Sequence, residues 1–162
     1  MKIEDWFQLG MKRQLAAPIA PTGKQLELGC GRTPIPNTIG LDWPTWIAPS
    51  LIPYGDNHFD TVWAHHFLEH LDGVDAIKML REIERVLCIG GTANIVTPYY
   101  SSHIQAQDLD HKSSYTEETW KTLFKNKYYD KNAHWQLAVH TCFIIGIVER
   151  NICLFTQLVK TQ

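Results

Sequence analysis

The sequence has no closely spaced cysteine pair and no long apolar run. Its cysteines never stand in a C-x-x-C arrangement and occur inside apolar or glycine-rich segments, at positions 30, 88, 142 and 153. This favours free thiols in a reducing compartment over a disulfide framework or a zinc knuckle. No apolar run is long enough to span a membrane, and the start, MKIEDWFQLGMKRQ, is amphipathic where a signal peptide would be hydrophobic. We therefore expect a cytoplasmic protein.

An excess of charge of one sign is also missing. The formal net charge is −2 and the pI is about 6.4, so no overall basic field would attract nucleic acid or an anionic membrane. We expect neither as a partner. The 162 residues, 44% of them hydrophobic, are enough for one buried core and too few for two. A single domain over residues 1–162 is expected, and its oligomeric state stays open.

Strand-like and helix-like segments alternate along the chain. Short apolar strands are expected in KQLELG, NTIGLD, FDTVWA and TANIVTP, and helices over residues 3–16, from Asp72 to Gly90-Gly91, and from Thr116. In the second helix the apolar residues recur every three or four positions, at Val74, Ile77, Leu80, Ile83 and Leu87. Residues 101–110 read as a polar loop, and two β-rich runs around residues 149–151 as a closing antiparallel hairpin. The alternation predicts an α/β fold with a mostly parallel sheet.

The run LELGCGRTPIPNTIGLD carries the clearest chemical signal. Gly29 and Gly31 directly follow a strand, where they let backbone N–H groups approach a ligand closely. Asp42 ends the next strand and could accept hydrogen bonds from two ribose hydroxyls. The pattern predicts a nucleoside ligand, and the alternative is a tight turn followed by an ordinary terminal aspartate. Pro34 stands near where a dinucleotide fingerprint would have its third glycine.

The stretch HFLEH raises a different possibility. On a helix, His66 and His70 would share one face and could bind zinc, with Glu69 available to deprotonate a bound water and His65 as a further ligand. A zinc peptidase also needs a third protein ligand well downstream, and Glu149 stands at the expected hairpin turn. A zinc hydrolase therefore remains the less favoured alternative.

Four blocks of the sequence are informative by their order and spacing: LELGCG, GLD, IPYGDNHFDTVWAHHFLEHL and LREIERVLCIGGTANIVTP. In these blocks the chain resembles a class I S-adenosylmethionine-dependent methyltransferase of the compact type 11 group. The resemblance runs from about Lys24 to Thr122 and implies a Rossmann-like sheet, here with a reduced early helix and third strand. It implies S-adenosylmethionine as cofactor and S-adenosylhomocysteine as product. The residues that it places at the cofactor are Glu27, Gly29, Cys30, Gly31, Asp42, Trp43, Ser50, Leu51, His65 and His66. Among these, Trp43 would stack on the adenine, and Ser50 stands where the family commonly has an acidic residue.

The same resemblance accounts for HFLEH without a metal, because the family has a similar LEHL sequence after its fourth strand. We therefore expect no metal ligands in this stretch. His65 and His66 would line the route of the methyl group, and His70 would more simply begin a helix.

Methyl transfer needs the acceptor aligned with the methyl carbon and the sulfur, and it needs a base only when the acceptor is protonated. The loop after the fifth strand of the family fold offers the expected catalytic residues Tyr99, His103, Asp110 and His111. We expect a small-molecule acceptor, with residues 1–20 as a helical lid and residues 100–115 as a substrate-side loop. Two alternatives stay open: His111 and Lys112 could merely hold the loop, and the chain could be an inactive cofactor-binding regulatory module.

Overall fold

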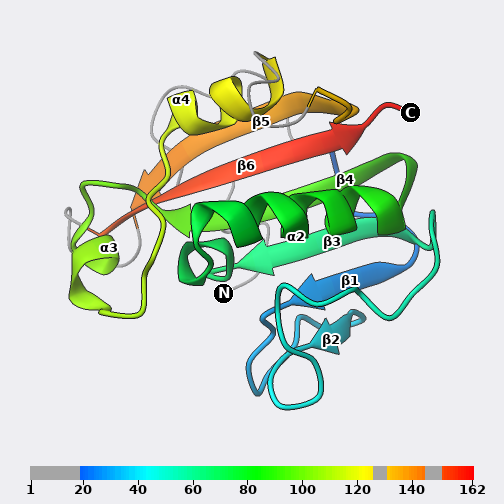
Figure 1. Ribbon diagram of the computed structural model, residues 1–162, viewed down its shortest axis with the longest axis horizontal. Coiled ribbons are helices and arrows are strands. Elements are labelled where there is room, and N and C mark those ends of the chain that lie inside the picture. Colours follow the sequence, from blue (N-terminus) through cyan, green and yellow to red (C-terminus); the bar gives the residue numbers. More distant parts are fainter. Residues whose placement is uncertain (1–18, 126–130, 145–150) are drawn as a thin grey trace.

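The computed structural model describes residues 19–125, 131–144 and 151–162. The expected helix over residues 3–16 and nearly all of the expected lid lie outside these ranges. Within them, no helix has the length and hydropathy needed to cross a bilayer. Figure 1 shows one twisted sheet that runs through the molecule, with helix α2 lying across its middle strands.

The described residues form a six-stranded sheet in the order β2-β1-β3-β4-β6-β5. The strands are β1 Gln25–Leu28, β2 Ile39–Leu41, β3 Phe59–His65, β4 Leu87–Pro98, β5 Trp135–Ile144 and β6 Ile152–Lys160. Neighbours among β1 to β4 pair in parallel, whereas β6 is antiparallel to both β4 and β5. The predicted fold class, a mostly parallel sheet with a C-terminal antiparallel pair, is confirmed. The turn predicted around residues 149–151 lies mostly outside the described residues.

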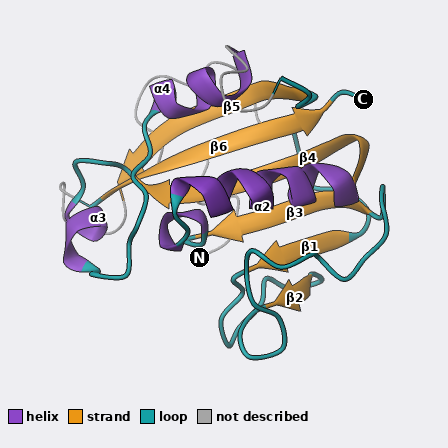
Figure 2. Cartoon of the chain, viewed as in Figure 1, coloured by secondary structure: helices purple, strands orange, loops and turns teal. Residues whose placement is uncertain are grey.

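The two early connections contain neither a helix nor a strand, as Figure 2 shows by their teal colour. Residues 29–38 lead directly from β1 to β2, and residues 42–58 lead from β2 to β3. The expected reduction of the early helix and of the third strand is therefore confirmed for these described segments. Both connections start at the carboxyl ends of strands, the edge at which parallel α/β sheets bind ligands.

Helix α2 spans Gly73–Val86, and Asp72 caps it by accepting hydrogen bonds from the backbone N–H groups of Val74 and Asp75. The buried apolar residues of the helix are Ala76, Met79, Leu80, Ile83 and Val86, and Glu84 is buried with them. Val74, expected among the buried residues, is 64% exposed, because it lies in the first turn beyond the edge of the core.

The expected helix end at Gly90-Gly91 is wrong. The chain turns extended at Leu87, which is fully buried and pairs with Phe59 of β3. Pairing within the sheet therefore ends the helix before the glycines are reached, and both glycines lie inside β4.

The segment after β4 is more ordered than the expected loop. Residues His103–Gln107 form the short helix α3, capped by the Ser102 hydroxyl, which accepts from the Ile104 N–H. That cap supplies the physical reason for the difference, because a serine followed by non-glycine residues can start a turn of helix. The helix expected from Thr116 is confirmed as α4, Glu117–Trp120, which continues as a π-helical turn, η2, over Lys121–Lys125.

Candidate functional site

The glycine loop follows β1 and contains Gly29 and Gly31, whose surroundings differ. Gly29 has a φ of +67°, and a Cβ on it would lie 2.7 Å from the Phe67 ring. Gly31 has a φ of +59°, and no described atom lies within 4 Å of its Cβ position. Gly29 is therefore required by packing, whereas Gly31 leaves its backbone open on the outer side.

Asp42 joins this loop to the end of β2. One carboxylate oxygen accepts a hydrogen bond from the Gly31 N–H at 2.6 Å, and the other accepts from the Trp43 N–H at 2.7 Å. A carboxylate has about four acceptor positions, so these two bonds leave room for further donors. The Trp43 ring is 75% exposed beside it. Free space beside Gly31, the Asp42 carboxylate and the exposed Trp43 side chain are thus neighbours.

Glu27 and Cys30 are directed toward the loop itself. The Glu27 carboxylate is buried and accepts from the Ile35 N–H at 2.5 Å, and burial raises its pKa against the lowering effect of that hydrogen bond. Burial also raises the pKa of the Cys30 thiol, and the nearby carboxylates of Asp42 and Glu27 raise it further. Glu27 therefore stabilises the shape of residues 29–38, and the Cys30 thiol lies 3.6 Å from the Gly31 carbonyl within the same loop.

Ser50 and Leu51 lie on an exposed turn whose backbone is hydrogen-bonded to buried side chains and to side chains of α2. Leu51 is 68% exposed, but its carbonyl accepts from the buried Trp46 indole N–H at 3.1 Å. The next residue, Ile52, donates its N–H to Glu82 at 2.9 Å and accepts from Arg85 at 3.0 Å. The turn is therefore fixed to α2 while its own side chains face outward.

His65 ends β3, and His66 follows it directly. Burial, and then the neighbouring His66, lower the pKa of His65 to about 4, so this ring is neutral at pH 7. His66 has a φ of +49°, a conformation uncommon for a residue with a side chain. Its Nδ1 lies 3.1 Å from Glu69 Oε1 and its Nε2 lies 3.8 Å from Cys153 Sγ. The positive φ of His66 thus marks the point where the chain leaves β3 at the carboxyl edge of the sheet.

The four expected catalytic residues have different surroundings. Tyr99 donates its hydroxyl to Glu117 at 3.0 Å. His103 begins α3 and is exposed, and Asp110 is exposed in the loop that follows. The side chain of His111 is only 5% exposed: its Nδ1 lies 3.1 Å from the Gln105 carbonyl, and its ring meets the His70 ring edge-on with 4.9 Å between the centroids.

The burial of the His111 side chain corrects the expectation that it lies in an open polar loop. The polar sequence around it suggested a loop with little to bury, yet residues 108–113 fold back onto the turn that contains Glu69. The Glu69 carbonyl accepts from the Lys112 N–H at 2.7 Å and from the Ser113 N–H at 3.1 Å. The alternative in which His111 and Lys112 hold the loop is therefore supported by these contacts.

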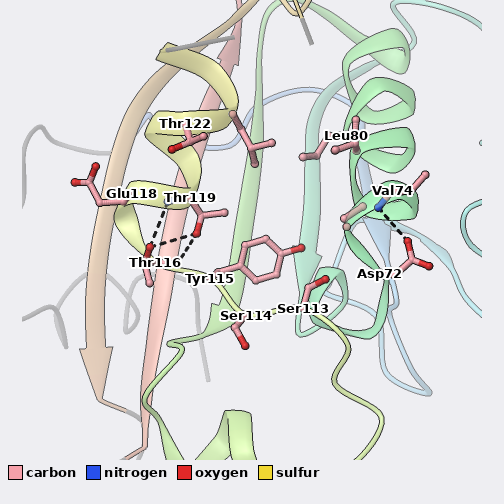
Figure 3. Close-up of a pocket in the computed structure, with 14 residues that line it drawn as sticks. Asp72, Val74, Leu80, Ser113, Ser114, Tyr115, Thr116, Glu118, Thr119 and Thr122 are labelled. Carbon is pink, nitrogen blue, oxygen red and sulfur yellow. Dashed lines mark hydrogen bonds between the residues drawn. The ribbon is translucent and has the colours of Figure 1, made fainter. Parts of the chain in front are cut away.

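A cavity of about 800 Å³ is lined by none of the expected cofactor-binding or catalytic residues, although Ser113, Ser114 and Tyr115 of the expected substrate-side loop contribute to its wall (Figure 3). It opens between the first half of α2 and the segment that runs into α4 and η2, and Tyr115 projects into the space between them. Its walls combine the apolar side chains of Val74, Ile77 and Leu80 with the hydroxyls of Thr116, Thr119 and Thr122. None of its lining residues comes from β1, β2 or the glycine loop. The sequence pattern assigned Val74 to the core, but this residue is exposed and lines the cavity.

Comparisons with known proteins bear on the family and on the fold. The sequence model of the type 11 methyltransferase family, described as a methyltransferase domain, matches residues 47–95. No curated protein matches the sequence.

Solved structures match over most of the chain. A chain from the Haloferax volcanii complex between the Trm112 methyltransferase activator and a methyltransferase is 16% identical, with a TM-score of 0.64, and the match covers 90% of this chain and 85% of that one. The YcgJ protein of Bacillus subtilis is 14% identical, with a TM-score of 0.62 and coverage of 86% and 92%. A Thermotoga maritima S-adenosylmethionine-dependent methyltransferase is 14% identical, with a TM-score of 0.56 and coverage of 88% and 84%. The expected resemblance is confirmed: the chain resembles the type 11 methyltransferase family over residues 47–95 and has the Rossmann-like fold of the class I S-adenosylmethionine-dependent methyltransferases.

Proposed function

We propose that this chain binds S-adenosylmethionine and transfers its methyl group to a small-molecule acceptor. The observation that carries the proposal is the grouping of the free space beside Gly31, the Asp42 carboxylate and the exposed Trp43 side chain after the carboxyl ends of β1 and β2. Within this proposal residues 1–162 are one methyltransferase domain in the cytoplasm. The three described free thiols, Cys30, Cys88 and Cys153, are consistent with a reducing compartment.

The residues fit a nucleoside ligand chemically. Asp42 would hold the ribose hydroxyls with the acceptor positions that its two backbone bonds leave free, and Trp43 would cover the adenine. Ser50 and Leu51 would form the rim beside the adenine, and residues 29–31 would face the methionine part. His65 and His66 would border the path toward the acceptor, with Glu27 holding the loop in shape.

When bound, S-adenosylmethionine supplies a methyl group on an already activated sulfonium. The chain's task is then mainly to align the acceptor and exclude water. We propose that His103, Asp110 and Tyr99 act on the acceptor side, because His103 and Asp110 are exposed on the segment after β4, and the Tyr99 hydroxyl lies at the base of the same segment. The enclosed ring of His111 suits a supporting role better than that of a base.

The test is a screen of small-molecule acceptors that measures release of S-adenosylhomocysteine by the full chain. Alcohols, phenols, amines and thiols should be represented, because the fold alone does not fix the acceptor. We expect at least one acceptor to give turnover, and Asp42→Ala should abolish most of that turnover at low cofactor concentration. Binding of the cofactor with no turnover on any acceptor would favour the inactive regulatory module, and absence of cofactor binding would refute the proposal.

A further inference from the structure

Three side chains able to bind a metal ion meet beside the end of β3. Glu69 and His70 belong to the short 3-10 helix η1, Leu68–His70, and His111 comes from the loop after α3. One ligand atom from each lies within 4.8 Å of the ligand atoms of the other two. This set differs from the His66–Glu69–His70 set that the sequence suggested, because the structure places His66 as a hydrogen-bond partner of Glu69.

The Glu69 carboxyl group has too few hydrogen-bond partners. Its side chain is fully buried, Oε1 lies 3.1 Å from His66 Nδ1, and Oε2 finds no hydrogen-bond partner among the described residues. A buried carboxylate oxygen without a donor is costly, and such groups are normally paired or coordinate a metal. Burial raises the pKa of Tyr115, and the nearby Glu69 carboxylate raises it further. The site therefore contains an unsatisfied acceptor that a cation would satisfy.

His111 is oriented as a metal-binding histidine usually is. Its Nδ1 faces the Gln105 carbonyl at 3.1 Å, a partner that can only accept, so this nitrogen carries the proton. The other ring nitrogen, Nε2, makes no such bond to a carbonyl of the described residues and is the one left for a metal ion; it lies 3.8 Å from Asp108 Oδ2. Histidines that bind zinc typically donate their other N–H to a carbonyl or carboxylate in this way.

The backbone holds the three residues together without a metal. The Glu69 carbonyl accepts from the N–H groups of Lys112 and Ser113, and the Ser113 hydroxyl donates to the Leu71 carbonyl at 2.6 Å. The loop with His111 is thereby fixed against the turn with Glu69 and His70. Ligands at a tetrahedral zinc lie about 3.3 Å apart, as follows from metal–ligand bonds of about 2.0–2.1 Å, so small side-chain rotations would close the set around an ion.

We propose that Glu69, His70 and His111 bind one divalent transition-metal ion, for which zinc is the best chemical match. Two imidazoles and one carboxylate suit zinc, and three protein ligands leave a fourth position for water or for Asp108. The ion would neutralise the buried carboxylate and tie the loop after α3 to the end of β3. This site is separate from the Gly31–Asp42 site and does not depend on methyl transfer.

The test is a zinc titration of the full chain after chelator treatment, in competition with a chromophoric zinc indicator. We expect one zinc per chain and a higher melting temperature with the metal. His111→Ala and His70→Ala should each weaken zinc binding at least about 100-fold, since even the loss of an outer partner of a ligand costs 10–100-fold. The matched control, His103→Ala, removes an exposed histidine from the same segment and should bind zinc as the wild type does.

A wild-type chain that takes up no stoichiometric zinc, or a folded His111→Ala variant with unchanged affinity, would overturn the proposal. If the alanine variants fail to fold, cobalt substitution of the wild type still decides the question. We expect the visible d–d absorption of a tetrahedral nitrogen and oxygen site, without a thiolate charge-transfer band. Such a band would place the metal on Cys153 and His66 and would refute the Glu69–His70–His111 set.

Discussion

Replacement of Asp42 tests the proposed nucleoside site most directly. Each of its carboxylate oxygens already accepts one backbone N–H, from Gly31 on one side and from Trp43 on the other. An asparagine keeps the shape but offers a single acceptor oxygen, and its NH₂ group would face the second N–H. Asp42→Asn should therefore lose one of these backbone bonds, and Asp42→Ala should lose both.

The expected magnitudes follow from these bonds. Hydrogen bonds to charged groups contribute about 1.5–3 kcal/mol each, and exposed ones fall at or below the lower end. We expect Asp42→Ala to lower the free energy of unfolding by about 2 kcal/mol and Asp42→Asn by about 1 kcal/mol. Two further bonds to ribose hydroxyls would be lost from the complex, so cofactor affinity should fall by about 3 kcal/mol, or roughly 150-fold.

Isothermal calorimetry with S-adenosylhomocysteine measures the affinity, and urea unfolding measures the stability. Both should be carried out at a temperature where every variant is folded. Asp75→Ala serves as the control, because that carboxylate pairs with Lys78 on the exposed side of α2 and lies in none of the proposed contacts. A Kd for Asp42→Ala within threefold of the wild-type value would refute the assignment of Asp42 to the ribose.

Three further outcomes are expected. Trp43→Ala should change the free energy of unfolding by less than about 0.5 kcal/mol, because the side chain is mostly exposed. It should weaken the binding of S-adenosylhomocysteine about tenfold in calorimetry, and equal affinity would exclude stacking on the adenine. Gly29→Ala should lower stability in urea by about 1–3 kcal/mol, because it combines a left-handed φ with a contact of 2.7 Å to Phe67, and an unchanged midpoint would contradict this. His65 has a pKa of about 4 in the folded chain, against an ordinary value of 6.5. Between these pH values the unfolded chain binds more protons than the folded chain. The free energy of unfolding therefore decreases as the pH falls from 6.5 to 4. The loss should reach about 3 kcal/mol, and His65→Gln should flatten this part of the curve of unfolding free energy against pH; an unchanged slope would show that His65 is not responsible.

The parts of the fold that the sequence predicted correctly depend on signals that are local in the chain. Glycines after one apolar run and an aspartate after the next identified the ends of β1 and β2, because a strand end and a turn need only neighbouring residues to form. The cap at Asp72 and the capping box at Thr116 were equally readable. Each of these signals can be recognised without any knowledge of distant contacts.

The errors come from contacts between distant residues. The end of α2 was misplaced because Leu87 pairs with Phe59, and that pairing overrides the local effect of Gly90 and Gly91. The environment of His111 was misjudged for the same reason. Its burial depends on backbone bonds from Lys112 to Glu69, which join segments far apart in the sequence. No periodicity or spacing rule could show that His70 and His111 would be in ring contact.

The short connections around the proposed cofactor site contain no helix and are held by polar side chains. Residues 29–38 are pinned by the Glu27 and Asp42 carboxylates, which accept from backbone N–H groups on both sides of the loop. Residues 51–56 are pinned by Arg85, which donates to the carbonyls of Ile52 and Tyr54 and to the Asp56 carboxylate. Irregular backbone needs such partners, because it lacks the hydrogen bonds of helices and sheets. A site built this way depends on individual charges, so single substitutions at Glu27, Asp42 or Arg85 should disturb the ligand-binding edge more than the removal of an exposed apolar residue such as Leu51.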